Sequence, residues 1–325
     1  MRNCIEFLIN GLTLRGTHHS VASTSDPTAV AERIGVLMLN FGFAPRASLG
    51  DVTVHQSDHI AKLGYPVFRF DLPGLGDSDG DLPENAMTIL QIIQQGEHAP
   101  FTCQLIAEIK HRFKLDSILL AGHCGGAITA IYAADQLGGK DIVGMMIYEP
   151  DFILRGDIDC RTSRLEQLHQ EVRVNILGSK IGHISQALCA RLKRAKRGLK
   201  SLKIWKTDSN KLARIADEAE TGSHMQKSLP ARANLALIHS FQRVMRMRMR
   251  ILVVAVPDRK TADNFDYVDF LLSDNPPNVA SIVLRETNHS FVEGNGEQAL
   301  MNCTERWLLE NFPISTSDQM QSVLD

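Results

Sequence analysis

Short apolar runs without polar interruption recur along the chain, separated by amphipathic stretches of helical period. Uninterrupted runs of Val, Ile, Leu and Phe are typical of strands covered on both faces. The predicted strands are Ile34–Leu39, Tyr65–Phe70, Ser117–Ala121, Ile142–Tyr148, Ile251–Val256 and Val279–Leu284. The predicted helices are Asp51–Leu63, Ala99–Phe113, Ala127–Leu137, Ala262–Leu272 and Glu297–Asn311. This alternation predicts an α/β fold with a doubly wound, mostly parallel sheet.

Two segments depart from the alternation. The N-terminus reads as a hairpin, with an apolar strand, a turn at Asn10-Gly11 and a second strand through Leu14. About a hundred residues between Tyr148 and Arg250 lack a strand pattern, are helical in period and are rich in Lys and Arg. We interpret them as an inserted helical cap. The expected division is core 1–150, cap 151–249 and core 250–325.

A glycine-rich turn carries the first candidate for chemistry. The predicted strand Ser117–Ala121 runs into Gly122-His123-Cys124-Gly125-Gly126, and a helical pattern follows at once. A sharp strand–turn–helix elbow needs residues without bulk on both sides of an exposed nucleophile. The free N–H groups at the helix N-terminus favour a thiolate. We therefore expect Cys124 to be a nucleophile and the N–H of Gly125 to face a developing oxyanion. His123 should face away from the pocket and have a packing role.

A histidine follows the last predicted strand. His289 lies in the loop after Val279–Leu284, before a closing helix. Sites built on a nucleophile elbow take their residues in the chain order nucleophile, acid, histidine. Position thus singles out His289 among 12 histidines as the general base.

The acid has several candidates. Asp258 comes two residues after the strand Ile251–Val256 and is the preferred carboxylate to orient His289. Asp263 is another candidate, although it can instead cap the helix that follows. Glu149 and Asp151, just past the strand Ile142–Tyr148, are the remaining alternatives.

Two further motifs complete a resemblance. Asn40-Phe41-Gly42 ends the strand Ile34–Leu39, where an oxyanion loop is expected, and Arg69-Phe70-Asp71-Leu72-Pro73-Gly74-Leu75-Gly76-Asp77-Ser78-Asp79-Gly80 follows the next strand. With the elbow and Asn288-His289-Ser290-Phe291, these motifs resemble the serine-aminopeptidase-like α/β hydrolases. They are most similar to members with a cysteine nucleophile, such as hydrolases associated with exosortase and exopolysaccharide systems. The resemblance implies the α/β-hydrolase fold and an oxyanion hole at Gly125 and at Phe41 or Gly42. It gives no substrate.

Cysteine in place of serine restricts the substrate. Attack on an ester or thioester gives a thioester acyl-enzyme. With an amide, the thiolate is the better leaving group unless the amine is protonated, because a free thiol has a pKa of about 8.5. Esters, thioesters and lactones are therefore the expected substrates. Acyl transfer, elimination or cyclisation on the same site is the first alternative, and a non-catalytic binding protein on this fold is the second.

The composition indicates which partners, cofactors and cellular compartment to expect. Hydrophobic residues make up 44 % of the 325 positions and the formal net charge is -2, which argues against nucleic acid as a partner. None of the six cysteines has a metal-binding spacing, so neither a metal nor a cofactor is expected. No stretch approaches a membrane span, and scattered cysteines suit a reducing compartment. We expect a cytoplasmic protein.

The expected cap contains a strongly basic segment. Eight cationic side chains crowd it without an acid among them: Arg191, Lys193, Arg194, Lys196, Arg197, Lys200, Lys203 and Lys206. Such a segment is either a solvated basic face or a docking site for the anionic carrier of an acyl group, namely coenzyme A or an acyl carrier protein. The expected partner is therefore a small-molecule acyl substrate, presented free or on such a carrier.

Overall fold

The computed structural model describes residues 1–21, 33–81, 85–154, 232–257, 268, 271–272 and 276–314. The chain divides into two units, one formed by Met1–Ile158 with Asn234–Asp325 and the other by Asp159–Ala233. Most of the second unit lies outside the described residues, and so does the basic segment expected to dock a carrier. The first unit contains the sheet.

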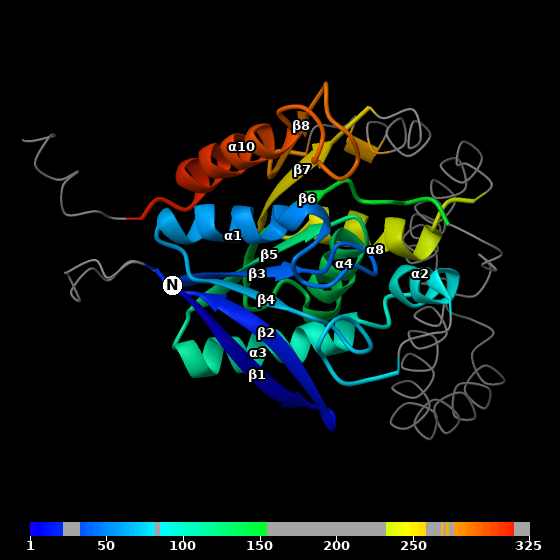
Figure 1. Cartoon of the computed structure of the whole chain (residues 1–325). Coiled ribbons are helices and arrows are strands. Elements are labelled where there is room, and N and C mark those ends of the chain that lie inside the picture. Colours follow the sequence, from blue (N-terminus) through cyan, green and yellow to red (C-terminus); the bar gives the residue numbers. More distant parts are fainter. Residues whose placement is uncertain are drawn as a thin grey trace, which may run out of the picture. The chain divides into compact units, whose positions relative to one another are not determined.

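Eight strands of the first unit form one sheet in the order β1-β2-β4-β3-β5-β6-β7-β8 (Figure 1). Their bounds are β1 Arg2–Ile9, β2 Leu12–His19, β3 Ile34–Leu39, β4 Val67–Phe70, β5 Ser117–His123, β6 Ile142–Tyr148, β7 Arg250–Ala255 and β8 Val279–Val283. Strands β3 to β8 are mutually parallel, whereas β2 pairs antiparallel with both β1 and β4. The predicted mostly parallel sheet is confirmed.

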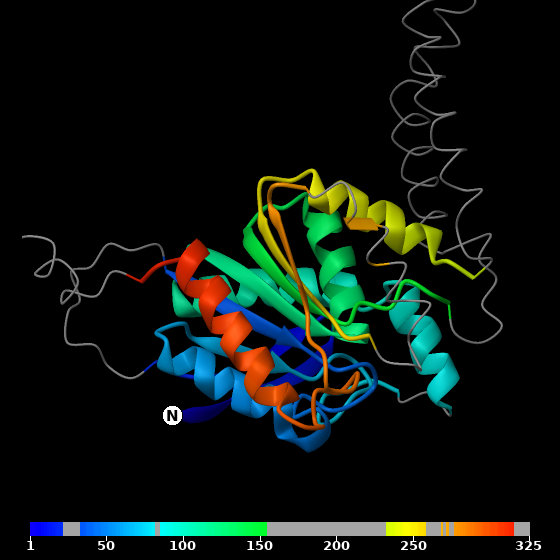
Figure 2. The same cartoon turned by 90° about the horizontal axis from the view of Figure 1, so that it is seen from above.

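Helices cover both faces of this sheet (Figures 1 and 2). Their bounds are α1 Val52–Lys62, α2 Ala86–Gln94, α3 Ala99–Phe113, α4 Gly125–Leu137, α8 Leu235–Met245 and α10 Gly296–Asn311, with a 3-10 turn at Leu49–Asp51. Helices α1 and α10 lie on one face, where Ile60 and Trp307 join a core with Val36, Leu119 and Val254 of the strands. Helices α3, α4 and α8 lie on the other. No helix in the described part of the chain is long and apolar enough to cross a membrane.

The N-terminal hairpin forms as its sequence predicts. Asn10 and Gly11 both adopt positive φ, 52° and 80°, which is the two-residue turn that matches the twist of paired strands. The second strand is longer than expected and continues past Leu14 to His19, because Gly16 to His19 pair with β4. The hairpin therefore extends the parallel sheet at one edge.

Helix α8 groups with the sheet unit, although its residues fall inside the range 151–249 expected for the cap. It packs through Phe241 against Phe152, with ring centroids 5.4 Å apart. It also binds α4, since Ser240 and Arg243 both donate hydrogen bonds to the Asp135 carboxylate. Helix α8 is therefore held to α4 by an ion pair and hydrogen bonds and to Phe152 by ring packing.

Candidate active site

Loops that follow parallel strands meet at the carboxyl edge of the sheet, where α/β folds place their ligand sites. Cys124 follows β5, Glu149 follows β6, and His289 lies in the loop after β8. Phe41 follows β3, next to β5 in the sheet. The structure therefore brings together Cys124, His289 and the predicted oxyanion loop, with Glu149 as the described acid among them.

The elbow at Cys124 is a strained turn. Cys124 has φ 51° and ψ -111°, a backbone conformation rare for a residue with a side chain, and it directly precedes α4. A Cβ on Gly122 would lie 2.3 Å from the carbonyl carbon of Gly126, and one on Gly126 would lie 2.5 Å from the carbonyl oxygen of Asn40. Both clashes are with backbone, so the turn requires glycine at these two positions, as the sequence predicted.

His289 connects the thiol to a carboxylate. Its Nδ1 lies 2.9 Å from Oε2 of Glu149, and its ring is close enough to Cys124 for the two side chains to interact electrostatically. Burial by itself would lower the pKa of His289, but the hydrogen bonds and charges of Cys124 and Glu149 outweigh it and raise the pKa to about 10. The arrangement thus favours a proton on the imidazole when its two partners are anionic.

Glu149 is held rigidly in this position. Its side chain is 3 % exposed, and its Oε1 accepts a hydrogen bond from the backbone N–H of Val256. Its own N–H donates to the carbonyl of Val254 at 2.8 Å. The residue has φ 50°, so the backbone bends just after β6 and turns the carboxylate toward His289. One oxygen is anchored to β7 while the other orients the histidine.

Two of the other candidate acids are outside the described residues, and the third makes a local contact. Asp258, the preferred choice from sequence, and Asp263 both lie outside the described residues. The Asp151 carboxylate accepts a hydrogen bond from the backbone N–H of Ile153 at 3.0 Å, a local turn contact. Among the described carboxylates, Glu149 is the partner of His289.

His123 has more than the predicted packing role. It is buried, and its Nε2 lies 2.6 Å from the carbonyl oxygen of His289. Burial, with the nearby charge of His289, lowers the pKa of His123 well below its ordinary value, so a neutral ring donates this hydrogen bond. Its ring also packs on Phe41, with centroids 4.1 Å apart. His123 therefore supports both the histidine loop and the oxyanion loop, a long-range role that no local pattern reveals.

The predicted oxyanion residues lie side by side. A Cβ on Gly125 would be 2.8 Å from Cα and 3.2 Å from N of Gly42, so the first turn of α4 abuts the loop after β3. The first N–H groups of a helix have no acceptor within the helix, so that of Gly125 can serve a substrate oxygen. Gly42 has φ 55°, with open space where a side chain would project. The structure therefore places the two predicted oxyanion segments in direct contact.

The remaining described cysteines differ from Cys124. Burial raises the pKa of Cys103 and of Cys303 to about 11 in each case, and Cys4 is exposed on the edge strand β1. Within the part of the chain that the structure describes, no group of three or more His, Cys, Asp and Glu side chains is placed to bind a metal ion. The described chemistry at the sheet edge is therefore that of thiol, imidazole and carboxylate.

Solved structures share this architecture. The α/β hydrolase GrgF from Penicillium sp. sh18 is 17% identical with a TM-score of 0.56, over 97% of this chain and 100% of that one. An α-β serine hydrolase homologue from Coxiella burnetii is 12% identical with a TM-score of 0.50, over 94% and 97%. The chain has the α/β-hydrolase fold. DcsB, solved with its substrate analogue, is 14% identical with a TM-score of 0.52, over 96% and 100%. No family model and no curated protein matches the sequence.

Proposed function

We propose that this α/β-hydrolase-fold chain is an enzyme that cleaves acyl esters or thioesters through a thioester formed on Cys124. The observation that carries the proposal is the placement of His289 beside Cys124 with its Nδ1 hydrogen-bonded to Glu149, on an elbow at the carboxyl edge of the sheet. A nucleophile beside a base that is oriented by a third group is the general signature of covalent catalysis. Cysteine in the elbow agrees with the finer resemblance to cysteine-nucleophile members of the fold.

The reaction follows from these positions. The Cys124 thiolate attacks the substrate carbonyl carbon, and the carbonyl oxygen becomes an oxyanion facing the N–H of Gly125 and that of Phe41 or Gly42. His289 gives its proton to the departing alkoxide or thiolate, which leaves Cys124 acylated. In the second half, His289 takes a proton from water as the water attacks the thioester. The acid product departs, Cys124 is released from the thioester, and His289 again carries a proton, as at the start of the cycle.

Glu149 orients the imidazole in both halves. It holds Nδ1, so that Nε2 is the ring atom left to exchange protons with sulfur and substrate. Because Val256 fixes the other carboxylate oxygen, the ring orientation is set before the substrate binds. The protein thus supplies position and charge, and the acyl group supplies the reactive carbon.

Trapping of an acyl adduct tests this proposal. Incubation with a panel of acyl thioesters and activated esters should add one acyl mass per chain, located at Cys124 by peptide mapping. Intact-mass spectrometry measures the adduct, and product analysis separates hydrolysis from transfer to an amine or alcohol. A chain that gains no acyl mass with any member of the panel, and whose Cys124 is inert toward electrophiles, would instead be a non-catalytic binding protein.

Cys124 should also be the fastest-reacting thiol of the chain. Cys124 lies beside His289 at the N-terminus of α4, whereas Cys103 and Cys303 are buried with pKa values raised to about 11. Brief treatment with iodoacetamide at pH 7, followed by peptide mapping, should modify Cys124 first. A Cys4→Ser chain removes the exposed thiol as background. Prior labelling of Cys103 or of Cys189 with Cys124 unmodified would contradict the assignment.

A further inference from the structure

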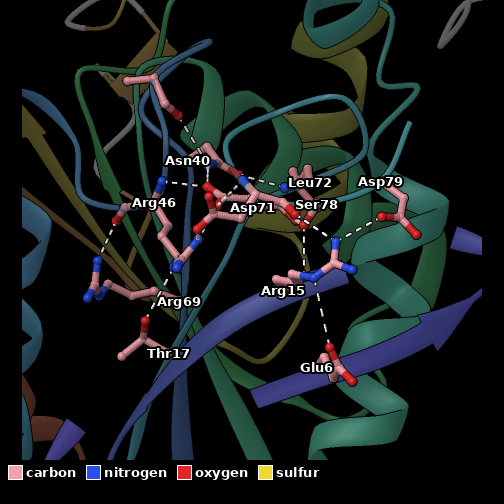
Figure 3. A network of polar contacts seen from close by, with 12 residues as sticks. Glu6, Arg15, Thr17, Asn40, Arg46, Arg69, Asp71, Leu72, Ser78 and Asp79 are labelled. Carbon is pink, nitrogen blue, oxygen red and sulfur yellow. Dashed lines mark hydrogen bonds and ion pairs between the residues drawn. The ribbon is translucent and has the colours of Figure 1, made fainter. Parts of the chain in front are cut away.

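A buried carboxylate outside the Cys124–His289–Glu149 series lies at the end of β4. Asp71 is fully buried, with 0 % exposed area, in the centre of the polar network of Figure 3. A carboxylate removed from water needs several hydrogen-bond donors or a paired charge. The identity of those donors shows which part of the molecule the buried charge organises.

Four N–H groups point at the Asp71 carboxylate. Oδ1 accepts from the side-chain amide of Asn40 at 3.1 Å and from the backbone N–H of Arg46 at 2.6 Å. Oδ2 accepts from the Arg46 guanidinium and from the backbone N–H of Asp77 at 3.1 Å. Three of these four donors belong to Asn40 and Arg46. These residues are the two ends of the loop that contains Phe41 and Gly42.

Asn40 makes further contacts that hold the loop Asn40–Arg46 in place. Its amide also donates to the carbonyl of Ala44 at 3.1 Å, inside the loop, and its Oδ1 accepts from the backbone N–H of Leu72 at 3.1 Å. Its backbone carbonyl lies against Gly126, where a Cβ would approach to 2.5 Å. The loop is therefore fastened to Asp71 on one side and seated on the elbow on the other.

Arg46 holds the far end through further polar contacts. Its Nε donates to the hydroxyl of Thr17 at 3.2 Å, and its carbonyl accepts from the Arg69 guanidinium at 2.7 Å (Figure 3). A second carboxylate, that of Asp77, has its Oδ2 2.9 Å from Nη1 of Arg46. The guanidinium is thus fixed in direction, and its backbone N–H is aimed at Asp71.

We infer that Asp71 is a positioning residue that clamps the loop Asn40–Arg46 and so sets the second oxyanion donor beside Gly125. This inference rests on the proposed function, because the donor matters only if an oxyanion forms at Cys124. The Asp71 carboxylate acts through the loop and does not touch the substrate. Replacement by asparagine keeps the size but puts an amide where only an acceptor satisfies the N–H groups of Asn40 and Arg46.

Two reactions of the same thiol separate this role from general stability. Acylation of Cys124 by an activated ester or a thioester generates an oxyanion and needs both donors. Alkylation by iodoacetamide displaces iodide from carbon, forms no oxyanion, and depends on the thiolate and His289 alone. Loss of the clamp should slow the first reaction and leave the second unchanged, whereas a collapse of the site slows both.

The experiment compares the full-length wild-type chain, Asp71→Asn and the control Asp79→Asn, with rates of both reactions measured by intact mass. Asp79 lies in the same turn, and its carboxylate binds Thr13 and Arg15. Asp71→Asn should slow acylation about 10²-fold or more, the usual loss on removing one oxyanion donor, with alkylation within about threefold of wild type. Asp79→Asn should leave both rates within about threefold.

The other outcomes are decisive as well. Unchanged acylation in Asp71→Asn, or an equal fall in both rates, overturns the clamp and leaves the proposed function standing. A wild-type chain that is alkylated but never acylated at Cys124 overturns both proposals. If Asp71→Asn gives no folded protein, Arg46→Lys carries the test, because it keeps the charge and removes the two-directional fork. That variant should slow acylation about tenfold with alkylation unchanged, and equal losses in the two reactions would again overturn the clamp.

Discussion

Replacement of His289 by alanine is expected to lower kcat by about 10³-fold or more, as for other directly acting proton-transfer residues. In the proposed mechanism the imidazole gives a proton to the leaving group and later takes one from water, so one substitution removes two proton transfers. A loss of 10³ corresponds to about 4 kcal/mol of transition-state stabilisation. Steady-state hydrolysis of the ester or thioester that acylates the wild-type chain measures the effect.

His55→Ala is the matched control for this measurement. His55 of α1 is also paired with a glutamate, its Nδ1 lying 2.6 Å from Oε1 of Glu297 in α10, but this pair is exposed to solvent. Exposed ion pairs contribute little, so kcat should stay within about twofold of wild type. A His289→Ala enzyme that keeps a tenth of the wild-type kcat would exclude His289 as the base.

The inner strands of the sheet, β3 to β7, could be predicted because they are buried on both faces. Such strands are continuous apolar runs, and β3 and β6 have the bounds that the sequence indicated. Strand ends that depend on pairing with a neighbouring strand were not predicted. Strand β5 runs on to His123, since Gly122 and His123 still pair with β6 despite their small or polar side chains. Helix α2 was not predicted, although its N-cap Asn85 accepts from the N–H of Thr88 at 2.9 Å.

Part of the candidate site could likewise be predicted from the sequence, and part could not. Cys124 and His289 follow from their places after strands, since parallel strands bring those loops to one edge. The acid does not follow, because Glu149 after β6 and Asp258 after β7 occupy equivalent sequence positions. What directs Glu149 to His289 is its φ of 50°, a conformation that no local pattern predicts for glutamate. The role of Asp71 likewise depends on partners from a distant loop.

Glu149→Gln is expected to lower kcat by about 10²-fold, less than His289→Ala, because the carboxylate orients the histidine without transferring the proton itself. The hydrogen bond from Val256 to this side chain determines which amide group of the glutamine faces His289. The N–H of Val256 requires an acceptor, so the amide oxygen of glutamine should take the Oε1 position. Its NH₂ group then faces Nδ1 of His289, where a protonated imidazole also presents an N–H.

Two donors in contact destabilise the imidazolium, so the pKa of His289 should fall from about 10 toward its ordinary value. A histidine whose pKa is raised in the folded protein stabilises it below about pH 6.5, and that contribution is lost as pH rises through about 10. At pH 7, Glu149→Gln should therefore lower the free energy of unfolding and slow alkylation of Cys124. Chemical denaturation and iodoacetamide kinetics on the same samples measure both effects.

Asp258→Asn and Asp151→Asn are the controls that decide between the acids. Both replace a carboxylate by its amide at a position that follows a strand in the sequence, and both should keep kcat within about threefold of wild type if Glu149 alone orients His289. The pH dependence of kcat/KM is an independent measurement. Glu149→Gln should shift the part of the pH profile that reports ionisation of His289, whereas the two controls should leave the profile unchanged. Full activity in Glu149→Gln together with a 10²-fold loss in Asp258→Asn would return the acid to the loop after β7.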